Sequence, residues 1–223
     1  SAQVNRHYWL GRSRPTFTKM AVMSQVTGLD NSHVLPPYFP VFRGEDYLFG
    51  AMVEYLFPHG AALEYDWCVP HVPLEDRSGK AAGEPVAFKG GIGLFIRYIT
   101  DHTNYDMDIS FEMRRKSLAL LLGAISESSN TGLHTIFQAE VAQTNASMLK
   151  SMGQQLQIAT MSQAPQDWQN YLQSGFNELT QALQTPASPK NIGGVPEDMS
   201  AEEVIDVAKS YVAEFAAALE AWP

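Results

Sequence analysis

The stretch FPVFRGEDYLFGAMVEYLFPHGAALEYDWCVPH, residues 39–71, decides the fold of the N-terminal half. After its acidic pair, apolar residues recur at three- and four-residue spacing, which is typical of a helix with one buried face. Pro58 ends this pattern, because proline cannot continue a helix. Glu45 and Asp46 fall in the first turn, where the helix dipole favours negative charge. We therefore expect a helix that begins near Glu45 with two carboxylates.

Short strands are predicted on both sides of this helix. TFTKMAVMSQV, within residues 12–26, partly alternates between apolar and polar residues, as a strand with one buried face does. ALEYDWCVPHVP, residues 62–73, predicts a second strand that two prolines end. Between the first strand and the helix, GLDNSHVLPPYFPVFRG (residues 28–44) contains three prolines, which remove ladder donors and predict an extended loop.

The character of the sequence changes to helical near Gly91. SLALLLGAI, residues 117–125, is apolar on nearly all sides and predicts a buried helix. Residues 131–158 place one apolar stripe on a long Gln-, Thr-, Asn- and Ser-rich helix, and residues 167–183 predict another. The last helix should begin at Ser200, where Glu203 completes a capping-box pattern.

These patterns predict an α+β fold in two parts. A small β-containing part occupies residues 1–90, and a mainly α-helical region occupies residues 91–223. Residues 75–90 form a connection rich in Gly, Pro and charged residues.

The composition is that of a folded globular protein, with 45% hydrophobic and 17% charged residues in a chain of 223. The net charge of −9 is uneven, because residues 1–103 carry −1 and residues 104–223 carry −8. Nucleic-acid binding needs clustered cations, so the acidic half argues against a nucleic-acid partner. The apolar run from Leu118 to Ile125 is far shorter than the roughly 20 residues that span a bilayer, so we expect no transmembrane segment.

Cysteine use indicates the compartment. The single cysteine, Cys68, excludes an intramolecular disulfide and fits a reducing environment. No basic-then-apolar signal peptide is visible, so we expect a cytoplasmic location. The sequence begins at Ser1 rather than Met, which suggests a processed product or a piece of a longer chain.

A known family is resembled by three features in this order: the Pro-rich loop, the Arg-Gly-Glu-Asp helix start and a histidine about 25 residues later. Residues 16–77 resemble the acceptor half of bacterial, family-2-like, GT-A-type nucleotide-sugar glycosyltransferases. The resemblance implies a transferase that moves a sugar from a nucleotide sugar to a glycan or another hydroxyl acceptor. It also implies that the N-terminal part has the acceptor half of a GT-A-type domain.

The resemblance assigns roles to four residues. Sugar transfer needs a base for the acceptor hydroxyl, and Asp46 matches that position in an inverting reaction. Glu45 or Arg43 would orient the acceptor or hold the base. A divalent metal, Mn or Mg, would offset the charge of the leaving diphosphate in the full-length protein, and His71 matches the position of a metal ligand.

Three further residues are candidates for binding the acceptor. Asp30 and Asn31 offer hydrogen bonds to a hydroxylated group, although Asp and Asn after Gly also suit an ordinary turn. Trp67, with Tyr65, could stack on a sugar ring or serve a core. In the same way, Glu45 and Asp46 could act only at the helix start, and His71 could be a strand-end histidine.

Half of a complete enzyme of this type is missing from the sequence. Only about 30 residues precede the Pro-rich loop, too few for a nucleotide-binding unit, and the motif Asp106-Met107-Asp108 comes after the acidic pair. We expect the isolated chain to be inactive. The alternative hypothesis is a non-catalytic domain that uses its helical half for homo-oligomerisation or partner binding. A hydrolase is less supported, because the adjacent Glu45 and Asp46 make a poor acid–base pair across one bond.

Overall fold

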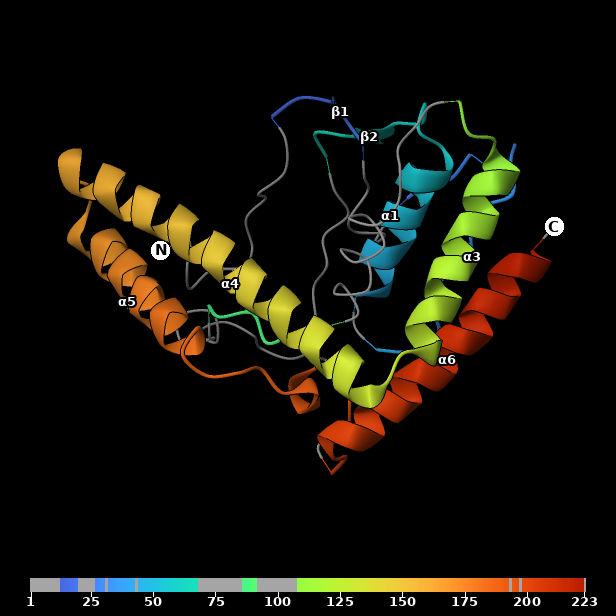
Figure 1. The fold of residues 1–223 in the computed structure, drawn as a ribbon. Helices are drawn as coiled ribbons and strands as arrows, with labels where there is room; N and C mark the ends of the chain where they lie inside the picture. The colour runs from blue at the N-terminus through green and yellow to red at the C-terminus, as the bar shows by residue number, and fades with distance from the viewer. Residues whose placement is uncertain are drawn as a thin grey trace.

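The computed structural model describes residues 13–19, 27–30, 32–42, 44–67, 86–91, 108–192, 194–196 and 198–222. Within these ranges the chain is mainly helical with a small β part (Figure 1). The elements in chain order are β1 (Thr16–Thr18), α1 (Glu45–Leu56), β2 (Ala62–Glu64), α3 (Phe111–Glu127), α4 (Asn130–Met161), α5 (Gln166–Ala182), the 3-10 helix η1 (Pro189–Asn191) and α6 (Ala201–Ala221). This arrangement confirms the small β part and the helical second half that the sequence predicts.

Helix α1 begins where the acidic pair predicts. Gly44 precedes it with φ 109°, a left-handed conformation that favours glycine. Its backbone N–H donates to Oε2 of Glu45 at 2.9 Å. The helix ends two residues before Pro58, and its apolar side packs inward, with Met52 and Tyr55 almost fully buried.

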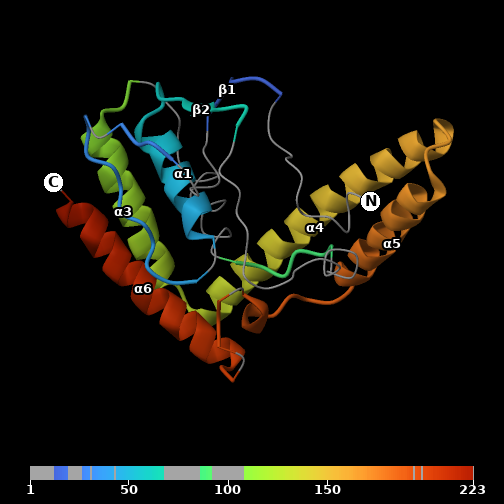
Figure 2. The same cartoon turned by 180° about the vertical axis from the view of Figure 1, so that it is seen from behind.

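Helices α3 and α6 run antiparallel, side by side, and α1 packs against α3 (Figures 1 and 2). The larger core cluster lies among these three helices. It joins Leu48 and Met52 from before residue 90 to Leu118, Val212 and Leu219 from after it. The β-containing part and the helical region therefore share one core.

Helices α4 and α5 form a long hairpin that extends away from the α1, α3 and α6 group (Figure 2). The hairpin closes tightly because α5 has a glycine at the contact: a Cβ on Gly175 would lie 2.5 Å from the sulfur of Met152. At the base of α4, Phe137 and Val141 belong to a second, smaller core cluster with Val204 of α6.

Residues 86–91 cross the α4–α5 hairpin and are held by side chains. Asn145, buried in α4, donates from Nδ2 to the carbonyl of Phe88 at 3.0 Å and accepts at Oδ1 from its N–H at 2.8 Å. Gly90 has φ 107°, and a Cβ there would lie 2.6 Å from the ring of Phe137. A glycine is required at this position both by its backbone conformation and by the space available.

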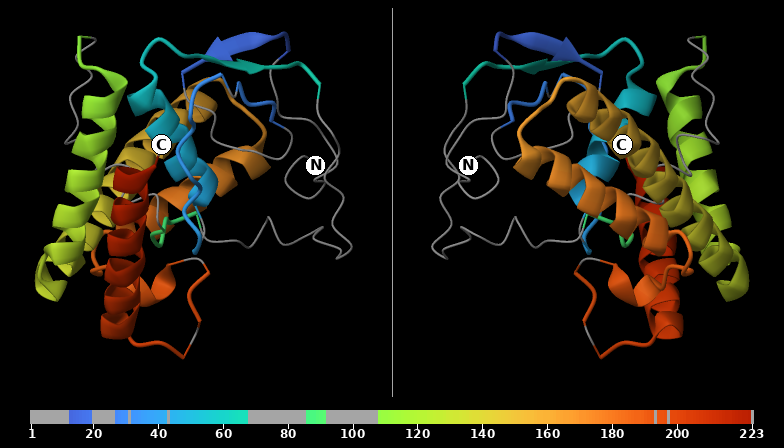
Figure 3. Two further views of the ribbon diagram at one scale, coloured as in Figure 1. Left: turned by 90° about the vertical axis from the view of Figure 1, so that its right-hand side faces the viewer. Right: turned by 90° about the vertical axis from the view of Figure 1, so that its left-hand side faces the viewer.

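The two strands are shorter than the sequence predicts, with three residues each, and they pair antiparallel with Phe17 opposite Leu63 (Figure 3). The expectation of one buried face is wrong for β1, because the side chain of Phe17 is 75% exposed. Leu63, which lies opposite Phe17, is exposed as well, so the described residues leave this side of the sheet uncovered. Residues 20–26 and 68–73 of the predicted strands lie outside the described residues.

The stretch 117–125 is also less buried than its composition indicates. Helix α3 buries Leu118, Leu122 and Ile125, but Leu120 points outward and is 75% exposed. None of the helices in the described ranges combines the length and the apolar character needed to cross a bilayer.

Candidate functional site

A cavity of about 590 Å³ lies along α1, between this helix, the Pro-rich loop and the start of α3. We refer to it as the α1 cavity. Aromatic and aliphatic side chains make up much of its wall, among them Leu35, Tyr38, Phe49, Val53, Phe57 and Phe111. The described residues with ionisable side chains that also line it are Lys19, Asp30, His33, Asp46, Glu54, His59 and Arg114.

Asp46 lines the cavity from the first turn of α1. Gly50 and Val53 follow it on the same side of the helix at spacings of four and three residues, and both also line the cavity. Glu54 lines it one residue further on. Asp46 thus lies in the positive field of the helix N-terminus and is the first residue of α1 that lines the cavity.

The Pro-rich loop supplies the facing wall and a second carboxylate. The backbone N–H of Ser32 donates to Oδ1 of Asp30 at 2.9 Å, and this hydrogen bond holds the pKa of Asp30 below its usual value. Further along the loop, the ring of Tyr38 stacks on that of Phe49 with centroids 4.1 Å apart and an angle of 6°. The loop therefore brings an ionised acid and an aromatic surface to the same cavity.

Two cationic side chains that line the cavity donate hydrogen bonds to backbone carbonyls of neighbouring segments. The side chain of Arg114 on α3 is fully buried, and it donates from Nε to the carbonyl of Ile109 at 3.2 Å and from Nη1 to that of Tyr55 at 3.3 Å. Its guanidinium carbon lies 5.3 Å from the centroid of the Tyr55 ring. Lys19 donates from Nζ to the carbonyl of Pro58 at 2.7 Å, so residues 13–19 are joined to the end of α1.

The C-terminal part of helix α6 contacts the Pro-rich loop that forms one wall of the cavity. The indole Nε1 of Trp222 donates to the carbonyl of Leu35 at 2.7 Å, and Phe39 packs edge-on against Phe215 with centroids 5.1 Å apart. Because Leu35 lines the cavity, the end of α6 helps to set the position of the wall.

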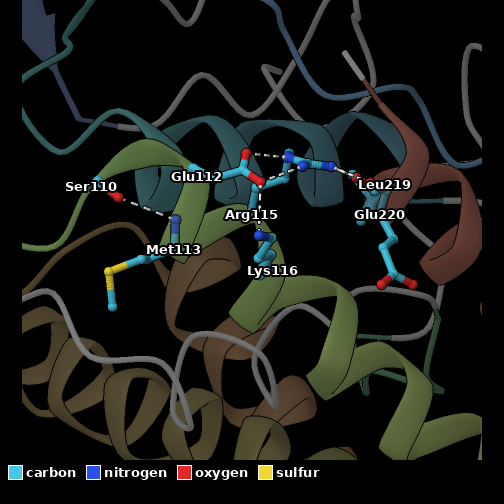
Figure 4. A network of polar contacts seen from close by, with 7 residues as sticks. All are labelled: Ser110, Glu112, Met113, Arg115, Lys116, Leu219 and Glu220. Atoms are coloured by element: carbon cyan, nitrogen blue, oxygen red, sulfur yellow. Dashed lines mark hydrogen bonds and ion pairs between the residues drawn. The ribbon is translucent and has the colours of Figure 1, made fainter.

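The end of α6 is in turn fixed to α3 (Figure 4). Nη1 of Arg115 donates to the carbonyls of Leu219 and Glu220, both at 2.5 Å, at the C-terminal end of α6. Glu112 accepts from Nη2 of Arg115 at 2.8 Å, and this hydrogen bond holds the pKa of Glu112 below its usual value. Two adjacent residues of α3 thus act on different sides of the cavity. Arg114 contacts the end of α1, and Arg115 contacts the end of α6, which in turn contacts the Pro-rich loop.

The structure brings together only some of the site residues predicted from the sequence. Asp46 and Asp30 line the same cavity. Glu45 accepts from the backbone N–H of Gly44, and Trp67 is exposed with its ring 5.5 Å from that of Tyr65. Among the described residues that line the cavity, Glu45 and Trp67 do not occur. Arg43, Asn31 and His71 lie outside the described residues.

A metal centre finds no support in the described part of the chain. Within it, no group of three or more His, Cys, Asp or Glu residues is placed to hold a metal ion. The predicted ligand His71 lies outside that part. The Mn or Mg site of the full-length protein therefore stays a prediction from family resemblance.

Sequence reasoning missed most of the ionisable residues in the cavity. Three of them lie on segments that are far apart in sequence or belong to different elements: Lys19, His59 and Arg114. Pro58-His59-Gly60 does mark a turn after a helix, a place where functional residues often occur. For Lys19 and Arg114 no local pattern distinguishes a cavity position from an ordinary surface position.

Comparison of the chain with protein-family models finds no matching family, and neither the curated proteins nor the solved structures provide a match. The glycosyltransferase resemblance of residues 16–77 therefore stays a prediction.

Proposed function

We propose that the chain is the acceptor-side part of a glycosyltransferase and that the α1 cavity binds the hydroxyl-bearing acceptor. One observation carries this proposal. Asp46 and Asp30, which are 16 positions apart and were both candidates from the sequence, line one cavity of about 590 Å³. That volume lies within the range of ordinary small-molecule sites, about 300–1,000 Å³.

The chemistry proposed for Asp46 is general-base catalysis. The acceptor hydroxyl oxygen would attack the anomeric carbon of the donor while its proton passes to the carboxylate of Asp46. The bond from the anomeric carbon to the diphosphate oxygen breaks, and the nucleoside diphosphate leaves with the electron pair. Asp30, whose pKa is lowered by the Ser32 hydrogen bond, stays ionised and accepts a hydrogen bond from another acceptor hydroxyl.

The proposal covers the acceptor side alone. We expect the nucleotide sugar, and any divalent metal that it requires, to be bound by the remainder of a full-length protein. In such a protein, Asp46→Asn should abolish transfer while leaving folding and donor binding nearly intact, because it removes a base without changing shape. Wild-type turnover in that variant would contradict the role of Asp46.

A binding experiment tests the acceptor site in the chain itself. Titration calorimetry with methyl β-D-glucopyranoside should give weak binding that Asp46→Asn reduces at least fivefold. Asp167→Asn is the matched control, because Asp167 also lies in the first turn of a helix, α5, but does not line the cavity. Equal affinities in the parent chain and both variants would refute the proposed site.

A second candidate function is self-association through the α4–α5 hairpin. At its far end Ile158 is 58% exposed and Met161 is 78% exposed, and Trp168 stacks on Tyr171 with centroids 5.5 Å apart. Few charges occur on this hairpin, so a second copy would meet little electrostatic repulsion. This arrangement favours the non-catalytic alternative, in which two hairpins pack together.

Light scattering distinguishes this second function from the first. If the hairpin ends associate, the parent chain is a dimer or larger and Met161→Gln with Ile158→Gln shifts it to a monomer. A parent chain that is monomeric at high concentration would rule out this second candidate. The double variant should leave glucoside binding unchanged, because neither residue lines the α1 cavity.

A further inference from the structure

We propose that the acceptor of the α1 cavity is amphipathic, with a hydroxylated head group near Asp46 and an apolar tail that lies along α1. This inference rests on the proposed function, because it takes Asp46 as the end of the cavity at which the acceptor hydroxyl binds.

The length of the cavity is the first reason. Its lining follows one side of α1 at helical spacing through four positions, Asp46, Gly50, Val53 and Phe57. The first and the last of these are eleven positions apart, which corresponds to about 16 Å along the helix axis at a rise of about 1.5 Å per residue. The cavity therefore extends along the whole of α1, well beyond the surroundings of one carboxylate.

The change in chemistry along the cavity is the second reason. Beyond Asp46 the cavity lining from α1 and its C-terminal end is apolar except for Glu54: Gly50 has no side chain, and Val53 and Phe57 present hydrocarbon. On the walls, the stacked pair Tyr38 and Phe49 adds aromatic surface. An apolar group that contacts Val53 and these two rings gains free energy by leaving water.

The far end, around Phe57, combines aromatic rings with the polar residues Lys19, His33 and His59. Lys19 already donates to the carbonyls of Pro58 and Gly60, so its ammonium group is occupied in part by the backbone. The centroid of the Phe57 ring lies 6.0 Å from that of His33 and 5.2 Å from that of Phe111. Aromatic rings thus line the far end beside a cation that the protein itself hydrogen-bonds.

The size of the cavity agrees with such a ligand. The volume of about 590 Å³ lies near the middle of the range for small-molecule sites, about 300–1,000 Å³. A single methyl glycoside would leave much of the apolar section filled with water. An acceptor with a tail displaces that water from apolar walls, which is the favourable part of hydrophobic binding.

The test is a calorimetric titration of the full chain with alkyl β-D-glucopyranosides from methyl to hexyl, each below the concentration at which it self-associates. We expect affinity to rise two- to fourfold for each added methylene. Fourfold corresponds to about 0.8 kcal/mol, the transfer free energy of a fully buried methylene. A series with equal affinity from methyl to hexyl would overturn the amphipathic acceptor.

A variant locates the tail. Val53→Trp fills the middle of the cavity and should reduce the gain, measured within the variant's own series, to less than 1.5-fold per methylene. Tyr47→Trp adds the same group at an exposed position of the same helix and should leave the series unchanged. Should Val53→Trp not fold, Val53→Thr replaces a methyl by a hydroxyl and should reduce the gain in part. An undiminished gain in a folded Val53 variant would place the tail elsewhere and overturn the inference.

The outcomes separate this inference from the proposed function. If methyl glucoside binding depends on Asp46 but longer chains add nothing, the acceptor site stands and the amphipathic acceptor fails. If no glucoside responds to Asp46→Asn, the proposed site itself fails.

Discussion

Replacing Arg114 by methionine removes the guanidinium that joins the end of α1 to the start of α3. Arg114 is fully buried and donates to the carbonyl of Tyr55 in the last turn of α1 and to that of Ile109 before α3. Helix α1 has no basic residue of its own in its last turn, so this cation from α3 complements its dipole. Methionine retains much of the hydrophobic stem but leaves both carbonyls without this donor.

The expected loss of stability follows from these contacts. Hydrogen bonds from a charged donor contribute about 1.5–3 kcal/mol each, and the contact with the Tyr55 ring adds about 0.5–1 kcal/mol. Removing a buried charge also removes its desolvation cost, which offsets part of the loss. We therefore expect a net destabilisation of about 3 kcal/mol, which lowers the Tm by roughly 6–12 °C for a chain of this size.

Thermal unfolding followed by circular dichroism measures this change. Lys116→Met is the matched control, because Lys116 lies on the same helix with an exposed side chain and makes a surface ion pair with Glu112. Such substitutions change stability by no more than about 0.5 kcal/mol. Arg114→Lys should fall between the two, because lysine keeps the charge but loses the planar fork of donors. A decrease for Arg114→Met no larger than that for Lys116→Met would refute this role of Arg114.

Two further predictions concern the helical half. Asn145→Ala removes two hydrogen bonds to the backbone of residues 86–91. We expect the free energy of unfolding to fall by about 2 kcal/mol and the Tm by roughly 4–8 °C. The control Gln143→Ala, at an exposed position of the same helix, should change the Tm very little. The hydrogen bond from the backbone N–H of Ser200 lowers the pKa of Glu203, so its contribution is complete above the ordinary pKa of 4.5 and is lost as the pH falls below it. Between about pH 5 and about pH 3 the Tm of Glu203→Gln should therefore fall less than that of the parent chain; identical decreases would contradict this.

Helices α1 and α6 were predictable from the sequence because their signals are local. The acidic pair and Pro58 bracket α1, and Ser200 with Glu203 forms the capping box that the structure shows. The apolar stripe of α4 was also visible, since Phe137 and Val141 are buried as their spacing indicates. Such patterns depend only on residues within a few turns of each other.

The rest depends on contacts between distant segments. Nothing near Arg114 in the sequence shows that its side chain meets the end of α1, and nothing near Trp222 shows that it holds Leu35. The exposure of Leu120 was missed because the run around it is uniformly apolar, and composition alone does not show which side packs. Of the candidate site, the two aspartates were identified from their local pattern, whereas the cations require the fold.

The most direct test of the proposed site is amide chemical-shift mapping of the 24.7 kDa chain with three probes: methyl glucoside, hexyl glucoside and UDP-glucose. We predict that both glucosides shift amides in the first turn of α1, around Asp46, and in residues 27–42. Hexyl glucoside should extend the shifts along α1 to Phe57. UDP-glucose should shift no amides other than those that methyl glucoside shifts. Glucoside shifts confined to the α4–α5 hairpin, or a complete absence of shifts at Asp46, would contradict the account.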